Sequence, residues 1–123
     1  MIYTKAKALA NLKPNKQFTW SGEEYSGLTW LESETKPTEA EIDAELTRLT
    51  NAESIRLLRV ERDRLLAACD WVVLSDSQLT TTKKTAWKTY RQSLRDLPAS
   101  SSPTLDSNGN LDMSSVTFPT EPS

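Results

Sequence analysis

The feature that most constrains the fold is a segment that starts at Thr38 and has no glycine or proline until well past Cys69. Thr38 follows Pro37 and is the expected N-cap, and Glu41 stands three residues later, as in a capping box. We therefore predict a helix over residues 39–69, which would be about 46 Å long at a rise of 1.5 Å per residue. Such a helix exceeds the diameter of a small domain, so it either breaks or projects.

The apolar repeat changes phase inside this segment. Residues 50–54, which separate two apolar stripes, are polar, short or β-branched and form helices weakly. One helix with a phase slip and two helices in line are both consistent with this pattern. The stripes consist of Ile42, Leu46 and Leu49, and of Ile55, Leu58, Leu65 and Cys69.

The residues before Pro37 predict a small head. A short helix fits residues 3–12, and two aromatic and β-branched runs at 17–21 and 28–31 flank turn residues that include two glycines. Alternation places Phe18 with Trp20 on one face of the first strand and Leu28 with Trp30 on one face of the second. We predict a β-hairpin that shelters the two tryptophans and leans on another element, since an isolated hairpin is marginal in water.

The segment after Cys69 predicts a helical hairpin. An apolar run at 72–74 leads into a loop through Asp76, and a second helix begins at Thr80, Thr81 or Thr82 and reaches about Arg95, where Leu97-Pro98 ends it. This helix would pack against residues 55–69. Its predicted buried face consists of Ala86, Trp87, Tyr90 and Leu94.

The tail has the composition of a linker. Serine, threonine and proline supply 14 of its 26 residues from Pro98 onward. Asn108-Gly109 predicts a tight turn, after which residues 116–119 could add one extended edge strand. Around this turn acidic and amide residues alternate in the wrong register for a calcium loop, so they indicate turn chemistry. These are Asp106, Asn108, Asn110 and Asp112.

Composition excludes most chemistry. The 123 residues include one cysteine and no histidine, and they contain neither a glycine-rich phosphate loop nor a cluster with zinc spacing. We therefore expect no catalytic, cofactor-binding or metal-binding residue, and we interpret Cys69 as buried packing. No apolar run approaches the roughly 20 residues that span a bilayer, and no signal-peptide pattern is present, so we expect a soluble, unexported chain.

Charge is unevenly distributed although the net charge is only -2. Residues 1–54 carry six basic and nine acidic side chains, residues 55–97 carry nine and five, and the tail carries three acidic ones. This layout favours docking of the tail or an acidic partner surface, and it lacks the dominant basic stripe of a nucleic-acid-binding domain. The basic run at 56–64 is interleaved with acids and is expected to be a solvated helix face, with contact to an acidic partner as the minority interpretation.

Several charged residues invite a catalytic interpretation, but a structural one is simpler. Asp70 ends one predicted helix and Arg91 lies midway along the opposing one, so a charge-assisted pair is expected to lock the hairpin. Arg95 and Asp76 are expected to pair near the loop. Trp71 and Trp87 are expected in the core.

The order aspartate-tryptophan, tryptophan-x-x-tyrosine-arginine and leucine-arginine-aspartate-leucine-proline within residues 62–98 resembles bacteriophage tail assembly chaperones, also called tail fibre assembly proteins. The head, reading FTW, YSGLTWLE and KPTEAEI between residues 18 and 42, is more loosely similar to the same family, as is the ending at Phe118-Pro119. We interpret the matching motif positions as fold-defining: Asp70, Trp71, Asp76, Trp87, Tyr90, Arg91, Leu94, Arg95 and Asp96.

The resemblance implies a non-enzymatic chaperone that binds a trimeric phage tail fibre protein in the host cytoplasm and assists its folding or trimerisation. The alternative that it implies is a permanent virion component capping the fibre tip. A DNA-binding regulator built on the helical hairpin is a third, less favoured interpretation. We predict no nucleic-acid or membrane partner, and the sequence permits self-association without requiring it. Tryptophans on a small hairpin are good interface candidates, and the predicted contact residues are Trp20, Trp30, Ile42, Leu46, Leu49 and Phe118.

We thus predict an α+β fold that is mainly α, with a small N-terminal β-hairpin, a long helix that is whole or broken, a C-terminal helical hairpin and an extended tail. The predicted division has four parts: a head at 1–36, a connecting helix at 37–54, a helical-hairpin chaperone module at 55–98 and a tail at 99–123.

Overall fold

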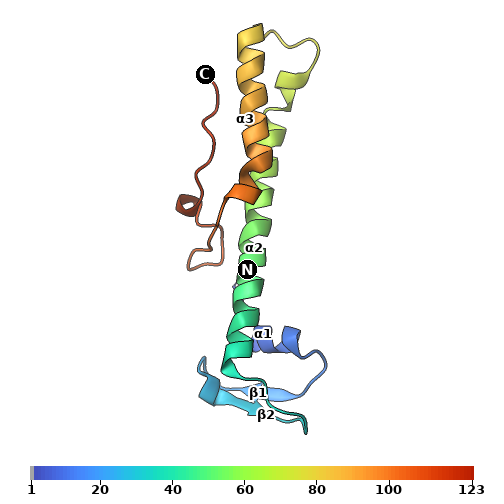
Figure 1. Ribbon diagram of the computed structural model, residues 1–123, viewed down its shortest axis with the longest axis vertical. Helices are drawn as coiled ribbons and strands as arrows, with labels where there is room; N and C mark the ends of the chain where they lie inside the picture. Colours follow the sequence, from blue (N-terminus) through green and yellow to red (C-terminus); the bar gives the residue numbers. More distant parts are fainter. Residues whose placement is uncertain (1) are drawn as a thin grey trace. The chain divides into compact units, whose positions relative to one another are not determined.

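A computed structural model describes residues 2–123 and confirms the predicted fold class (Figure 1). The chain forms two compact units, Met1–Glu53 and Ser54–Ser123, and helix α2 (Glu39–Ala68) contributes residues to both. The remaining elements belong to one unit or the other. The predicted division into four segments stays a prediction.

The N-terminal unit contains the predicted hairpin. Strands β1 (Phe18–Trp20) and β2 (Leu28–Trp30) are antiparallel, and Phe18 lies opposite Trp30 while Trp20 lies opposite Leu28. A 3-10 turn, η1 (Tyr25–Gly27), precedes β2 directly. Both strands are one or two residues shorter than predicted, although one backbone hydrogen bond continues the pairing beyond each end, from Ser21 N–H to the Gly27 carbonyl and from Leu31 N–H to the Gln17 carbonyl.

The hairpin leans on two helices, which supply the support that it was predicted to need. Helix α1 (Lys5–Leu12) begins at the N-cap Thr4 and lies with the hairpin around the first turns of α2 (Figure 1). The buried side chains at the centre of this unit are Ala8, Leu9, Leu28 and Ile42. Lys5 Nζ lies 3.3 Å from Glu39 Oε1, and Asn11 Nδ2 donates to Glu45 Oε2 at 3.1 Å, so polar contacts also join α1 to α2.

Helix α2 is continuous through the predicted phase slip. It begins as predicted, because Thr38 Oγ1 accepts a hydrogen bond from the Glu41 backbone N–H at 3.1 Å. Glu53 and Ser54 in the weak segment are only 5% and 2% exposed, and both have polar interaction partners. Burial with satisfied polar groups offsets their low helix propensity, so one helix forms rather than two.

The C-terminal unit contains the predicted helical hairpin. The last part of α2 leads into a 3-10 turn, η2 (Asp70–Val73), and then into α3 (Thr81–Ser100), whose N-cap Thr80 accepts from the Lys83 backbone N–H at 3.2 Å. One core cluster joins both helices and η2, with partly buried leucines around it. Its buried members are Cys69, Val72, Trp87, Tyr90 and Leu94.

Two predictions about α3 were wrong. Ala86 is exposed, because the buried stripe follows the 3–4 residue spacing of Trp87, Tyr90 and Leu94 and leaves it on the outer side. The helix also continues through Pro98 to Ser100. Its last turn is held by burial of Leu97 and by the Ser100 hydroxyl, which donates to the Asp96 and Leu97 carbonyls.

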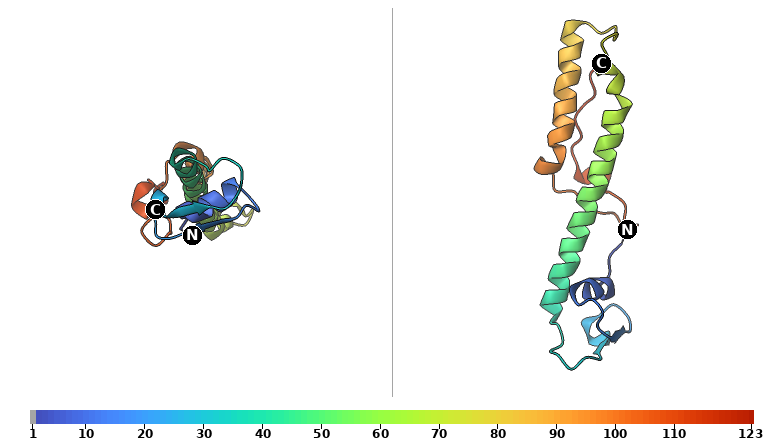
Figure 2. Two further views of the ribbon diagram at one scale, coloured as in Figure 1. Left: turned by 90° about the horizontal axis from the view of Figure 1, so that it is seen from below. Right: turned by 90° about the vertical axis from the view of Figure 1, so that its right-hand side faces the viewer.

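The tail is ordered and lies beside the helical hairpin (Figure 2). Gly109 has a φ of 80° in the predicted turn, and an isolated antiparallel bridge joins Leu105 to Leu111. Asp106 Oδ1 accepts from two backbone N–H groups of this loop, which confirms turn chemistry. The segment after Val116 forms no strand, and this prediction was wrong.

A buried valine anchors the tail. Val116 belongs to a second core cluster with Leu58 of α2 and Leu97 of α3, and Leu111 and Phe118 pack against it. The segment therefore gains its order from side-chain burial, which does not require the paired backbone of a strand. None of the helices within residues 2–123 combines the length and apolar character that crossing a membrane needs.

Candidate functional site

The predicted lock of the helical hairpin is present and centres on Arg91. Its Nη2 lies 3.0 Å from Asp70 Oδ1, its Nη1 donates to the Leu66 carbonyl at 2.9 Å, and Nη1 also lies 3.1 Å from Cys69 Sγ. Burial works to lower the pKa of Arg91, but the contacts with Cys69 and Asp70 outweigh it and raise this pKa above its ordinary value. Arg91 is only 7% exposed and is positively charged, and its contacts join α3 to the end of α2.

Three aromatic rings also join η2 to α3, and they extend from the core to the surface. Trp71 meets Trp87 edge to face at a centroid distance of 5.7 Å, and Trp87 meets Tyr90 in the same way at 5.6 Å. Trp87 and Tyr90 are buried as predicted, but Trp71 is 49% exposed. The prediction that Trp71 is core was wrong, because the η2 turn gives its ring one packed edge and leaves the other in solvent.

The other motif positions have separate surroundings. Leu94 is completely buried. Asp96 accepts a hydrogen bond from Gln92 at 3.0 Å on the exposed face of α3, and the Arg95 carbonyl accepts from Arg62 at 3.2 Å. Within residues 2–123 no ion pair joins Arg95 to Asp76, so that predicted pair was wrong. The loop carrying Asp76 belongs to the segment before α3 and leaves this carboxylate exposed.

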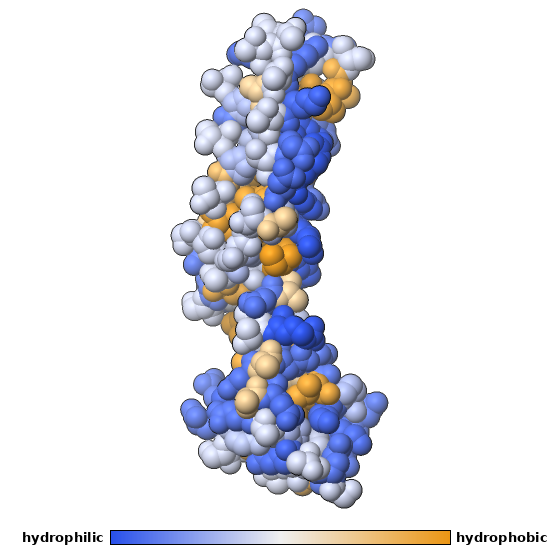
Figure 3. Space-filling view, viewed as in Figure 1, coloured by the Kyte–Doolittle hydropathy of each residue, from blue (hydrophilic) through white to orange (hydrophobic). Residues whose placement is uncertain are grey.

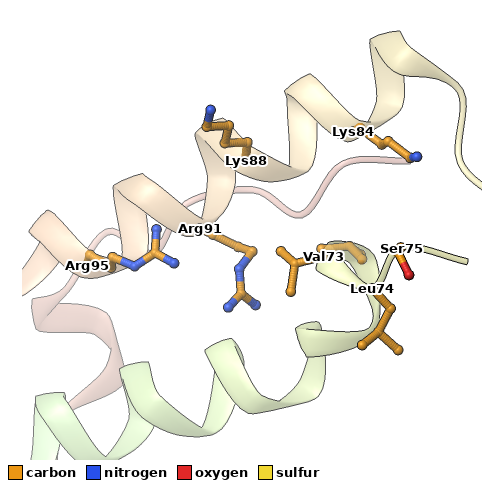
Figure 4. A pocket seen from close by; sticks show the side chains of 8 residues that line it. Val73, Leu74, Ser75, Lys84, Lys88, Arg91 and Arg95 are labelled. Carbon is orange, nitrogen blue, oxygen red and sulfur yellow. The ribbon is translucent and has the colours of Figure 1, made fainter. Parts of the chain in front are cut away.

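A hollow of about 430 Å³ lies between the η2 segment and α3 (Figure 4). One wall is apolar and is formed mainly by Val73 and Leu74, which are 66% and 57% exposed. The other wall is a row of cations from α3. We call this hollow the cationic groove, and its cationic wall consists of Lys84, Lys88, Arg91 and Arg95.

Sequence reasoning missed the cationic groove. The pattern predicts only a connection for the apolar run at 72–74, but two of its members, Val73 and Leu74, are exposed, as is the preceding Trp71. A signal was available, because the four cations recur at spacings of four, three and four residues, which places them along one side of a helix. Figure 3 shows an apolar patch over the η2 segment, bordered by hydrophilic side chains.

The predicted partner-binding residues occupy mixed surroundings. Trp20, Trp30, Leu46 and Leu49 are partly buried against the core of the N-terminal unit, and Ile42 has no exposed surface there. The indole N–H groups of the two tryptophans donate to the backbone carbonyls of Glu24 and Glu34, which orients both rings. Phe118 is partly buried against the tail cluster. Partner binding by these residues stays a prediction.

The described residues hold no group of three or more side chains that could bind a metal ion. In a comparison with protein families, the model of the phage tail assembly chaperone protein family matches residues 55–123. The chain therefore belongs to the phage tail assembly chaperone family, and the matched region contains the Arg91 lock, the cationic groove and the docked tail. Neither the curated proteins nor the solved structures include a match.

Proposed function

We propose that this protein binds a phage tail fibre protein in the host cytoplasm during assembly and assists its folding or trimerisation. Membership of a tail assembly chaperone family carries this proposal, since it implies an interaction with phage tail proteins. The family also suggests a non-enzymatic role, in which the protein acts by covering surface.

Exposed apolar side chains support a binding role for the matched region. Among residues 2–123 seven large hydrophobic residues are exposed, and three of them, Trp71, Val73 and Leu74, lie within four positions of each other. Clustered apolar surface of this kind marks protein-binding sites more often than scattered apolar residues do. A subunit awaiting trimerisation exposes apolar surface and strand edges that would otherwise aggregate, and a chaperone bound to them stabilises the unassembled form by mass action.

Co-expression tests this proposal. A tail fibre gene from the same phage is expressed with and without the protein, and the yield of soluble fibre trimer is measured by size-exclusion chromatography and unheated gel electrophoresis. We expect the yield to rise several-fold when the protein is present. An unchanged yield would refute the assembly role. Stoichiometric copies of the protein in purified particles would instead show that it is a permanent component of the fibre tip and not a transient chaperone.

A further inference from the structure

We propose that the cationic groove binds an extended acidic peptide segment that carries an apolar side chain. The groove has about the volume of known ligand pockets, which range over roughly 300–1,000 Å³. Its chemistry is two-sided: Val73 and Leu74 offer exposed apolar surface, and the α3 row offers cations (Figure 4). An occupant must therefore be both acidic and apolar.

Among the described residues, three of the four cations in the wall have no ion-pair partner. Among the residues that the structure describes, only Arg91 of the four cations forms an ion pair, with Asp70, and no carboxylate lies within ion-pair distance of Lys84, Lys88 or Arg95. Like charges spaced three or four residues apart on a helix repel each other, and Lys84 and Lys88 form such a pair. An acidic occupant would remove this repulsion.

The start of α3 strengthens the same preference. Its first turn contains no acidic residue, and Lys83 and Lys84 stand where the positive end of the helix dipole disfavours cations. By contrast, α2 carries Glu39 and Glu41 in its first turn. An anionic group beside Lys84 would be stabilised both by the ammonium of that side chain and by the positive end of the helix dipole. We therefore expect a carboxylate of the occupant to bind at the Lys84 end of the groove.

The dimensions fit a short segment. The row from Lys84 to Arg95 covers 11 helical steps, which is about 16 Å at 1.5 Å per residue. Extended chain rises about 3.3 Å per residue, so about five residues span the row. Alternation then directs carboxylates toward α3 and apolar side chains toward Val73 and Leu74. The assignment of this segment to a tail protein rests on the proposed function, whereas the groove's preference for acidic peptides does not.

Fluorescence anisotropy with defined probes tests the inference. The main probe is a labelled peptide of about eight residues in which leucine and glutamate alternate, and the comparison peptide has glutamine in place of glutamate. We expect saturable binding of the acidic peptide at low salt, at least about tenfold weaker binding of the glutamine peptide, and loss of affinity as salt shortens the Debye length. Equal binding of both peptides, or no binding of the acidic one, would overturn the inference.

Paired variants locate the site. Lys84→Gln with Lys88→Gln should weaken binding of the acidic peptide about fivefold. Lys7→Gln with Arg59→Gln, which removes two cations from exposed positions outside the groove, should leave the affinity within about twofold. Val73→Ser should also weaken binding about fivefold, and Val60→Ser, at a similarly exposed valine of α2, should not. Circular dichroism verifies that each variant is folded. Equal effects within either pair would overturn the placement in the groove.

A single-stranded oligonucleotide of about ten nucleotides is the competing polyanion. Tighter binding of the oligonucleotide than of the peptide would overturn the preference for peptides. The co-expression result is independent of these measurements. If the acidic peptide does not bind while trimer yield still depends on the protein, the groove inference fails alone, and if the peptide binds while trimer yield is unaffected, the proposed function fails alone.

Discussion

The guanidinium of Arg91 lies 3.1 Å from the sulfur of Cys69, at the point where α2 ends and η2 begins. The same nitrogen donates to the Leu66 carbonyl, one of the last carbonyls of α2, which lack partners within the helix. One side chain of α3 thus caps the end of the opposing helix and pairs with Asp70 beyond it. The lone cysteine, which is only 4% exposed, is part of this cap.

Replacing Arg91 should therefore destabilise the C-terminal unit. We expect Arg91→Ala to lower the free energy of unfolding by about 2–3 kcal/mol, because charge-assisted hydrogen bonds and the packing of a nearly buried side chain are lost together. Asp70→Asn should cost only about 1 kcal/mol, since that carboxylate is 66% exposed and its pair is screened by solvent. Urea denaturation followed by tryptophan fluorescence measures both values. A larger loss for Asp70→Asn would show that the ion pair, not the cap, dominates.

Gly27 should be irreplaceable in the N-terminal unit. A Cβ at this position would lie 1.8 Å from the Ser21 carbonyl oxygen, so Gly27→Ala must push apart the segments joined by the bond from Ser21 N–H to the Gly27 carbonyl. We expect a loss of about 2–3 kcal/mol in urea denaturation. Gly22→Ala is the matched control, because a Cβ at this position would contact no other atom. Only the positive φ of 76° disfavours alanine there, and we expect this backbone strain to cost about 1–2 kcal/mol. Equal losses would contradict the predicted clash.

The tail should detach when its anchor is shortened. Val116→Ala removes two methyl groups from a cluster in which Leu58 is fully buried, and we expect a cost of about 2 kcal/mol for tail docking. Limited proteolysis should then cleave the tail about tenfold or more faster than in the wild type. Met113→Ala, at a residue that is 52% exposed in the same segment, should leave the cleavage rate nearly unchanged. Unaltered cleavage of Val116→Ala would contradict anchoring by this residue.

Alkaline pH should weaken the C-terminal unit through Tyr90. Burial, assisted by the nearby Cys69 and Glu121, raises the pKa of Tyr90 above the ordinary value of 10.0. A pKa raised on folding means that the folded state holds the proton more tightly, so this stabilising contribution is complete below pH 10 and is lost as pH rises through the folded-state pKa. We expect the unfolding free energy measured in urea to fall more steeply above pH 10 in the wild type than in Tyr90→Phe. Parallel pH profiles of the two proteins would contradict this assignment.

Much of the fold could be predicted because its signals are local. Thr38 and Thr80 cap helices through hydrogen bonds to backbone groups three residues away. Alternation within two short runs predicted the hairpin faces, and the Asn108-Gly109 pair predicted a turn that Gly109 adopts with a positive φ. The Arg91–Asp70 pair was also predictable, since Asp70 follows the end of α2 and Arg91 lies midway along the helix that packs against it.

The amino-acid sequence alone determined where the helices and turns begin, because capping groups, prolines and glycines act on their own neighbours. Only the tertiary structure decided which side chains those elements cover. Pro98 lies within α3 because Leu97 is buried with Leu58 and Val116, which are distant in sequence. Trp71, Val73 and Leu74 are exposed beside four cations because η2 turns them away from the core, and burial depends on contacts between distant segments that no local pattern specifies.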